Sequence, residues 1–268
     1  MSKKKPIGKT QQHKSKKPRD EFKKTSDEFL FGVNPVIEVF RAKRRKIYEL
    51  YIVSEKVSGK FSEIIKLAEN INVPVTRLSY AELSKLAGTD SHQSVLAKVS
   101  PYPLVDISEM MTNKNDGLIL ILDGIEDPQN LGAIARTALC AGVDGIIIPK
   151  DRAAAPVPSA SKASAGALEH IKIAKVTNIA TTIKELKKNS FWITGLDAVS
   201  DSSLYKTDLT SSLAIVIGGE DRGLRDLVRK NCDFIVSIPQ KSSFNSLNAS
   251  VAGAVVLYEV VRQRESII

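Results

Sequence analysis

Cysteine, histidine and long apolar runs are all scarce in this chain of 268 residues. Its two cysteines, Cys140 and Cys232, have no other Cys or His nearby at metal-ligand spacing. We therefore expect neither a disulfide framework nor a zinc site, but two buried thiols in a reducing cytoplasm. No run approaches the roughly 18 apolar residues of a membrane span. The N-terminus carries charges where a signal peptide has its apolar segment, so we expect a cytoplasmic protein without a membrane anchor.

Positive charge is concentrated at the N-terminus. Residues 1–28 contain ten Lys or Arg and four Asp or Glu, which is +6 of the net charge of +9. Few apolar residues interrupt this segment, so it cannot bury enough surface to fold, and we predict a disordered basic tail. The tail is either an electrostatic arm for nucleic-acid phosphates or a solubilising extension without a specific partner.

Two α/β units follow the tail, at 29–100 and 117–268, with a proline-containing, polar linker at 101–116. In the first unit we expect helices at 35–42, 61–70 and 80–86, and strands at 47–53, 73–77 and 94–99. In the second we expect strands at 118–123, 145–148, 171–176, 191–195, 213–217 and 234–238, and a last helix at 246–264. The continuous apolar run at 118–123 is typical of a strand buried on both faces, so we predict a mostly parallel sheet flanked by helices.

Polar residues follow three of these strands, where ligands of parallel sheets bind. In the first cluster Asn130 stands where a helix begins, and Arg136 follows six positions later, so the two need not share a helix face. Arg136 is either a surface side chain or a clamp for a phosphate or carboxylate.

The second cluster, Gly218 to Gly223, comes directly after an apolar strand. Glycine allows a sharp turn and a close approach to a ligand, and Glu220 would orient a polar group or cap the next helix. A tight turn without a ligand is the alternative. The chain has no Gly-x-Gly-x-x-Gly after a strand and no Walker Lys-Ser/Thr, so a dinucleotide or P-loop site is not expected.

The third cluster is the stretch 238–259, in which a strand ends at a proline and a polar loop leads into an apolar helix. Ser246 and Asn248 lie in the first turn of this helix. Helix N-termini present free backbone donors, which favours ligand binding, but Ser and Asn at a helix start are also typical caps.

Together the three clusters resemble the SpoU/TrmH family of RNA ribose 2′-O-methyltransferases. The family motifs occur in order as Asn130-x-Gly132-x-x-x-Arg136, Ile217-Gly218-x-Glu220-x-x-Gly223, and Ile238-Pro239 followed by Ser246-Leu247-Asn248-x-Ser250-Val251-Ala252. The resemblance extends from about residue 29 to 264, since the segments 31–35 and 91–94 look like the family's ribosomal-protein-like substrate-binding domain. It implies a deep trefoil knot in the C-terminal parallel-sheet domain.

The resemblance also implies the cofactor, S-adenosylmethionine, and a role for each motif residue. The cofactor would be held through main-chain groups of Gly218, Ile238 and Leu247. The leading catalytic residue would be Arg136, with the ribose and Arg136 oriented by Asn130, Glu220, Ser246 and Asn248. In one alternative Arg136 would take or relay the 2′-OH proton. In the other Arg136 would clamp the ribose and the phosphate while water or a phosphate oxygen accepts this proton, because guanidinium groups keep their own protons in proteins. The sulfonium leaving group needs no metal.

Two-domain members of the family methylate a guanosine ribose of 23S rRNA, so RNA is the expected partner and 23S rRNA the expected target. The loop 240–245 departs from the subgroup pattern because it lacks glycine. A tRNA target, a non-catalytic rRNA-binding or ribosome-assembly factor, and a resistance methyltransferase for another rRNA loop stay open as alternatives.

The last helix presents an apolar stripe at helical spacing, which consists of Leu247, Val251, Ala254, Val255 and Tyr258. Part of the stripe would pack in the core. Because the family dimerises through the knotted domain, we also expect a homodimer that uses this helix. We expect His92 to contact RNA or make a local hydrogen bond, and His170 to be structural.

Overall fold

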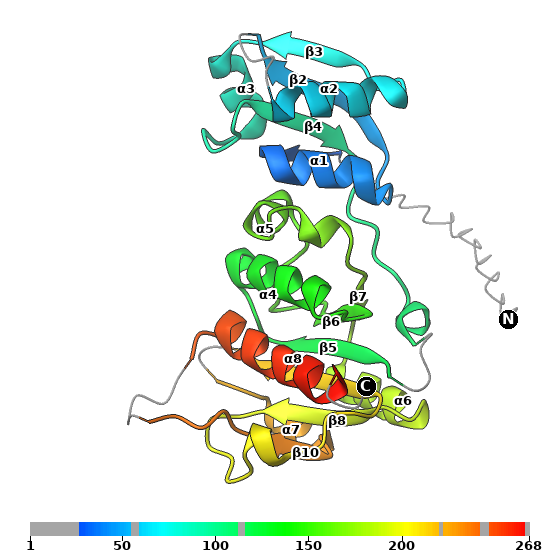
Figure 1. Ribbon diagram of the computed structural model, residues 1–268, viewed down its shortest axis with the longest axis vertical. Coiled ribbons are helices and arrows are strands. Elements are labelled where there is room, and N and C mark those ends of the chain that lie inside the picture. The colour runs from blue at the N-terminus through cyan, green and yellow to red at the C-terminus, as the bar shows by residue number, and fades with distance from the viewer. Residues whose placement is uncertain (1–26, 55–58, 112–115, 220–221, 242–246, 266–268) are drawn as a thin grey trace, which may run out of the picture.

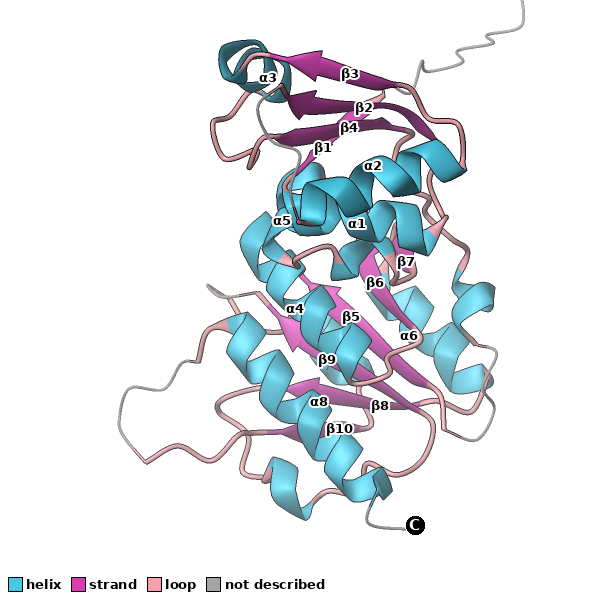
Figure 2. Ribbon diagram, turned by 45° about the horizontal axis from the view of Figure 1, so that its top comes forward, coloured by secondary structure: helices cyan, strands magenta, loops and turns pink. Residues whose placement is uncertain are grey.

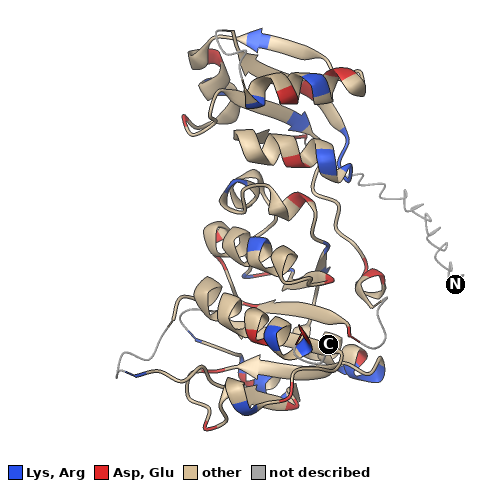
Figure 3. Cartoon of the chain, in the orientation of Figure 1, with Lys and Arg blue, Asp and Glu red and all other residues tan. Residues whose placement is uncertain are grey.

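The computed structural model describes residues 27–54, 59–111, 116–219, 222–241 and 247–265. Within these ranges the chain forms two sheets that lie one beyond the other along the long axis of the molecule (Figure 1). Residues 1–26, most of the predicted tail, lie outside the described part. Over the two units Figure 3 shows acidic and basic residues interspersed, in keeping with the net charge of only +3 that remains outside residues 1–28.

The first sheet is mixed and has the strand order β1-β4-β2-β3. Its strands are β1 (Glu28–Phe31), β2 (Ile47–Val53), β3 (Val75–Leu78) and β4 (Val95–Val99). The helices of this unit are α1 (Val33–Ala42), α2 (Lys60–Asn70) and α3 (Tyr80–Ala87). Apolar residues of α1 and α2 cover one face of the sheet, and Leu83 of α3 packs against Leu96 on the other.

The second sheet is parallel throughout and has the order β10-β8-β9-β5-β6-β7. Its strands are β5 (Leu118–Asp123), β6 (Gly145–Pro149), β7 (Ile173–Val176), β8 (Trp192–Leu196), β9 (Leu213–Gly218) and β10 (Phe234–Val236). The helices are α4 (Pro128–Cys140), α5 (Pro158–Ala163), α6 (Ile179–Lys188), α7 (Asp226–Asn231) and α8 (Ala249–Glu265). The prediction of a parallel sheet flanked by helices is confirmed.

The central strand β5 is buried on both faces because its side chains alternate between two cores. Leu118, Leu120 and Leu122 pack with α4, α5 and α8, whereas Ile119 and Ile121 pack with α6 and α7. Figure 2 shows α4 and α8 side by side on the first of these faces. Since all six strands are parallel, their carboxyl ends meet at one edge of the sheet, and the loops that leave this edge can converge on one site.

Every predicted strand is present, with ends that differ by two residues at most. The last predicted helix begins at Ala249, three residues later than expected. Some elements were missed, among them β1 and α5. β1 was missed because it is only four residues long and begins within the charged tail, and α5 because its Ala-, Ser- and Pro-rich sequence lacks an amphipathic pattern.

The expectation of two buried thiols was wrong for Cys140, which is exposed at the last turn of α4. Its neighbour Leu139 is 37% exposed as well, whereas Ala138 is fully buried, so Cys140 lies on the solvent-facing side of this turn. Cys232 is partly buried, and burial raises the pKa of its thiol to about 12.

Buried polar contacts join the two units. Arg44 donates hydrogen bonds to the main-chain oxygens of Ile171 and Pro103, and Tyr102 donates to Leu168 O at 3.0 Å. The neighbouring Arg45 is 1% exposed and forms ion pairs with Glu28 and with Glu169, in which the N–O distances are 2.5 and 3.5 Å. These contacts fix the first sheet above the face of the second that α4 and α5 cover.

Candidate active site

The site is organised around the ends of the two central strands, β5 and β9. Asp123 and Gly218, the last residues of these strands, are paired in the sheet register. The Asp123 carboxylate is buried, accepts a hydrogen bond from the main-chain N–H of Arg225 at 3.0 Å and forms an ion pair with its guanidinium at 3.3 Å. Asp123 therefore anchors the chain that follows β9 to the end of β5.

Glycines are required where this chain turns. A Cβ atom on Gly218 would lie 2.2 Å from the carbonyl carbon of Gly223, and one on Gly219 would lie 2.5 Å from Gly124 O. Gly223 has φ 61°, and its N–H donates to Gly219 O at 2.9 Å. The turn is thus too tight for side chains at the two leading positions.

Two cavities open at this edge of the sheet and share Gly219, Arg222 and Gly223. The polar cavity has a volume of about 750 Å³, and the rest of its lining is Asp123, Gly124, Ile125, Glu126, Asp127, Asn130, Arg152 and Arg225. The apolar cavity has a volume of about 390 Å³, and the rest of its lining is Leu196, Asp197, Ala198, Val199, Ile217, Gly218, Ile238, Gln240, Leu247, Ala249 and Ala252.

All three residues predicted to hold the cofactor line the apolar cavity. Gly218 ends β9, Ile238 follows β10, and Leu247 precedes α8. The tertiary structure brings together residues from the second and third sequence motifs, which are separated by about 20 positions along the chain. Their wall is apolar and small, so the cavity suits a ligand with a flat or apolar part.

The predicted polar residues fall into three groups. Asn130 lines the polar cavity, and its Oδ1 accepts a hydrogen bond from Nδ2 of Asn248 at 3.1 Å. Arg136 lies on the same helix as Asn130 but is exposed and lines neither cavity. Glu220 and Ser246 lie outside the described residues.

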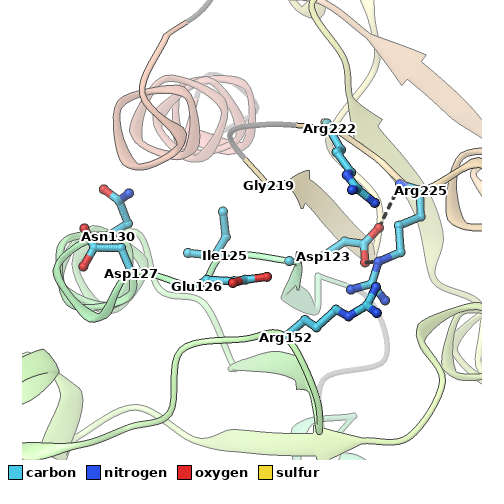
Figure 4. Close-up of a pocket in the computed structure, with 11 residues that line it drawn as sticks. Asp123, Ile125, Glu126, Asp127, Asn130, Arg152, Gly219, Arg222 and Arg225 are labelled. Carbon is cyan, nitrogen blue, oxygen red and sulfur yellow. Dashed lines mark hydrogen bonds and ion pairs between the residues drawn. The ribbon is translucent and has the colours of Figure 1, made fainter.

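The charged residues that line the polar cavity were not predicted as site residues; they are Asp123, Glu126, Asp127, Arg152, Arg222 and Arg225. Two of them had a signal in the sequence. Asp123 ends an otherwise apolar strand, and Arg152 follows the strand β6 on the carboxyl side, where ligands of parallel sheets bind. Figure 4 shows the three arginines on one side of the cavity, Asn130 and Asp127 at the start of α4 on the other, and Glu126 between them.

Gly132, the second residue of the first motif, has a packing role. A Cβ atom there would lie 2.5 Å from Ala160 O and 2.6 Å from the Cβ of Ala163. The motif glycine therefore allows α4 to approach α5 closely, and it does not line either cavity.

His92 and His170 have local roles. His92 is fully buried; its Nδ1 accepts from Ser94 N at 3.0 Å, and its Nε2 lies 2.9 Å from Ser84 Oγ. Burial lowers the pKa of His92, so of the two expected roles the structure supports the local hydrogen bond. His170 pairs with Glu38 of α1 at 2.8 Å and is structural, as predicted.

The described residues contain no group of three or more His, Cys, Asp or Glu side chains arranged to hold a metal ion. Nor does this part of the chain include a helix with the length and apolarity that crossing a membrane requires.

Two protein-family models match the chain. The SpoU rRNA methylase family model matches residues 117–258, more than half of the chain. The chain belongs to the SpoU rRNA methylase family. Residues 29–105 of this family member match a second model, that of the RNA 2′-O ribose methyltransferase substrate-binding domain. The resemblance drawn from the three motifs is thus confirmed.

Curated relatives agree with this membership. A Bacillus subtilis strain 168 protein, YacO, named for the TrmH family of tRNA/rRNA methyltransferases, is 38% identical over 244 residues, which cover 90% of this chain and 97% of YacO. A Staphylococcus saprophyticus protein named for the same family is 42% identical over 213 residues, 78% of this chain and 85% of that protein.

Solved structures share the fold of this SpoU family member. The SpoU methyltransferase AviRb from Streptomyces viridochromogenes, in complex with AdoMet, has a TM-score of 0.79 at 24% identity and covers 93% of this chain and 95% of its own. A TrmH/SpoU tRNA modifying enzyme of A. aeolicus has a TM-score of 0.52 at 27% identity, with 59% of this chain and 81% of that chain covered.

Proposed function

We propose that this protein transfers a methyl group from S-adenosylmethionine to a ribose 2′-OH in structured RNA, with a guanosine of 23S rRNA as the target. The observation that carries the proposal is that Gly218, Ile238 and Leu247 line one apolar cavity, which adjoins a polar cavity. Membership of the SpoU family supports the chemistry, and the AdoMet complex of the similar AviRb supports the cofactor.

The apolar cavity fits the cofactor. Gly218 and Gly219 leave main-chain groups of the lining free of side chains, and Ala249 and Ala252 add only small side chains to it. Asp197 adds a carboxylate at the end of β8. S-adenosylmethionine supplies a methyl group on a sulfonium centre, so neither a metal nor an acid is required to release the thioether. The chain must provide alignment and a destination for the 2′-OH proton.

Side chains of α4 and α8 would align the ribose. The amides of Asn130 and Asn248 are coupled to each other at the polar cavity and offer neutral hydrogen-bonding groups to a hydroxyl. Arg136 would hold the ribose and its phosphate, while water or a phosphate oxygen accepts the proton. Glu220 and Ser246 are proposed to help orient the substrate.

We also propose a homodimer through α8. Leu247, Val251 and Tyr258 of the predicted stripe are 40%, 48% and 53% exposed, so a large apolar surface along this helix lacks cover within the chain. Because α4 packs beside α8, an interface along α8 would extend towards α4, and Arg136 would serve a site near this interface.

The knot and the domain roles complete the proposal. A deep trefoil knot is part of the proposal, since Ile238 and Gln240 after β10 line the apolar cavity together with Leu196 of β8 and Ile217 of β9, and α8 packs on α4. Residues 29–100 would bind RNA as a ribosomal-protein-like domain, a role that the substrate-binding family model supports. The basic tail would contribute electrostatic attraction to RNA, and the cytoplasm is the proposed location.

A calorimetric titration with S-adenosylmethionine tests the cofactor assignment. We expect binding to the intact protein, and an absence of affinity would favour a non-catalytic assembly factor. Mapping 2′-O-methyl positions in rRNA from a deletion strain tests the target, because the loss of one 23S rRNA guanosine methyl group is expected. If the rRNA pattern is unchanged and a tRNA position is lost, the target is tRNA, which the names of the curated relatives also include.

A further inference from the structure

The polar cavity holds three arginines that the proposed methyl transfer leaves without a role. Arg152 follows β6, and Arg222 and Arg225 lie on the chain after β9. Their side chains gather on one side of the cavity (Figure 4). Cations that face one space repel one another unless anions lie close to them, so the local charge balance decides what this cavity can bind.

Among the residues that the structure describes, carboxylates at the cavity balance only part of this charge. Asp123 pairs with Arg225 at 3.3 Å. Asp127 caps α4, since its Oδ1 accepts a hydrogen bond from Gln129 N at 2.8 Å. Glu126 is exposed and lies between the two sides of the cavity.

Arg152 and Arg222 are left with positive charge. In the ranges that the structure describes, neither has a carboxylate within ion-pair distance. Both are exposed at the cavity, so each guanidinium group can donate two hydrogen bonds to an anion such as a phosphate.

The backbone at Arg152 gives a second observation. Its φ is 55°, in the left-handed region that favours glycine. A side chain there raises the energy of the turn, and glycine would relieve it. The side chain points into a cavity at the carboxyl edge of the sheet, where it can meet a ligand.

We propose that Arg152 and Arg222 bind consecutive phosphates of the RNA strand that carries the target ribose. The inference rests on the proposed function and deepens it. In RNA the 3′-phosphate lies next to the 2′-OH, so an anion site is needed beside the methyl donor. Arg222 lines both cavities and shares with Arg136 the phosphate next to the reacting hydroxyl, and Arg152 takes the neighbouring phosphate.

The Arg152→Gly variant tests the proposal, because glycine suits the backbone and removes only the guanidinium. Tritiated S-adenosylmethionine and total RNA from a deletion strain serve as substrates. We expect the KM for RNA to rise about tenfold or more, the effect of one lost charge-assisted contact. The plot of log kcat/KM for RNA against log salt concentration should become shallower by about 0.7–0.9. The affinity for S-adenosylmethionine, measured by calorimetry, and the thermal stability should not decrease.

Lys188→Ala is the matched control for Arg152→Gly, because it also removes one positive charge. Lys188 is exposed at the end of α6, which returns the chain from the carboxyl end of β7 to the start of β8, and so lies at the far edge of the sheet. This variant should keep the parental KM and salt slope. Arg152→Lys keeps the charge but lacks the bidentate fork of the guanidinium group. Its KM for RNA should lie between that of the parent and that of the glycine variant.

Several outcomes would overturn the inference. They are a parental KM and salt slope for Arg152→Gly, an equal loss in Lys188→Ala, or a weaker affinity of Arg152→Gly for S-adenosylmethionine. A parent protein that binds no S-adenosylmethionine and transfers no methyl group would instead overturn the proposed function, so the two failures are distinct.

Discussion

The side chains of Asn130 and Asn248, 118 positions apart, meet in a hydrogen bond of 3.1 Å between α4 and the start of α8. Oδ1 of Asn248 also accepts from Ser250 N at 2.9 Å. Because that N–H can only donate, the Asn248 oxygen faces α8 and its amide nitrogen faces Asn130. Asn248 thus caps α8 and at the same time reaches the polar cavity side of α4.

Asn248→Ser separates these two functions. Serine is a good cap but is too short to reach Asn130, so the free energy of unfolding should change by less than about 1 kcal/mol. Methyl transfer to RNA should fall about tenfold to a hundredfold, since the ribose loses alignment. Denaturant titration and a tritium-transfer assay measure the two quantities.

Asn178→Ser is the matched control for that change. Asn178 caps α6 through Thr181 N at 3.0 Å and lines neither cavity, so this variant should transfer methyl groups at the parental rate. Equal rates for Asn248→Ser and the parent would show that the amide bridge does not position the substrate.

Arg136→Ala should abolish most methyl transfer while leaving the affinity for S-adenosylmethionine unchanged, because Arg136 lines neither cavity. Arg136→Lys should recover only part of the rate, since lysine cannot hold phosphate and ribose in one fork. A tritium-transfer assay beside a calorimetric titration distinguishes the two effects. Near-normal transfer by Arg136→Ala on bound RNA would remove this residue from the mechanism.

The exposed stripe of α8 predicts the oligomeric state. Tyr258→Glu places a charge in the proposed interface and should convert a dimer into a monomer at micromolar concentration, as measured by light scattering. Leu227→Glu is the matched control, because Leu227 is 59% exposed on α7 over the other face of the sheet. A parent protein that is already monomeric would contradict the prediction.

Buried His92 predicts that acid destabilises the protein. Burial lowers the pKa of His92 in the folded state, so below the ordinary value of about 6.5 the unfolded chain binds more protons. The stabilising contribution is therefore present above that pH and is lost as the pH falls towards the lower folded-state value. Urea titrations at several pH values between 5 and 8 measure the free energy of unfolding. In the His92→Asn variant this free energy should depend less on pH. Parallel pH curves for the two proteins would assign the effect to other groups.

The buried ion pair between Arg45 and Glu169 is expected to stabilise the contact between the two units. Arg45→Ala leaves the buried carboxylate of Glu169, the pKa of which burial raises, without its cationic partner. We expect a loss of about 3–5 kcal/mol in the free energy of unfolding, measured with denaturant. Lys66→Ala, at an exposed position of α2, should change it by less than about 0.5 kcal/mol. Similar losses in both variants would mean that the buried ion pair is not a specific support.

The sequence predicted the strands of the second sheet because their apolar runs are a local property. It also predicted that polar motifs after β5, β9 and β10 would meet, since parallel strands end at one edge. The exposure of Cys140 was not predicted, because it depends on which side of α4 the rest of the fold covers. Periodicity along one helix does not contain that information. For Arg136 a surface position was one of the two interpretations, and the side chain is exposed.

By itself the sequence determined the alternation of strands and helices, the order of the motifs and the membership of the family. Only the tertiary structure decided that Gly218, Ile238 and Leu247 line one cavity, and that Arg152 joins Arg222 at another. The physical reason is that a cavity is a property of packing between distant segments. The walls of the two cavities together come from the ends of β5, β6, β8, β9 and β10 and the loops that follow them, and their spacing is set by close contacts such as that of Gly219 with Gly124.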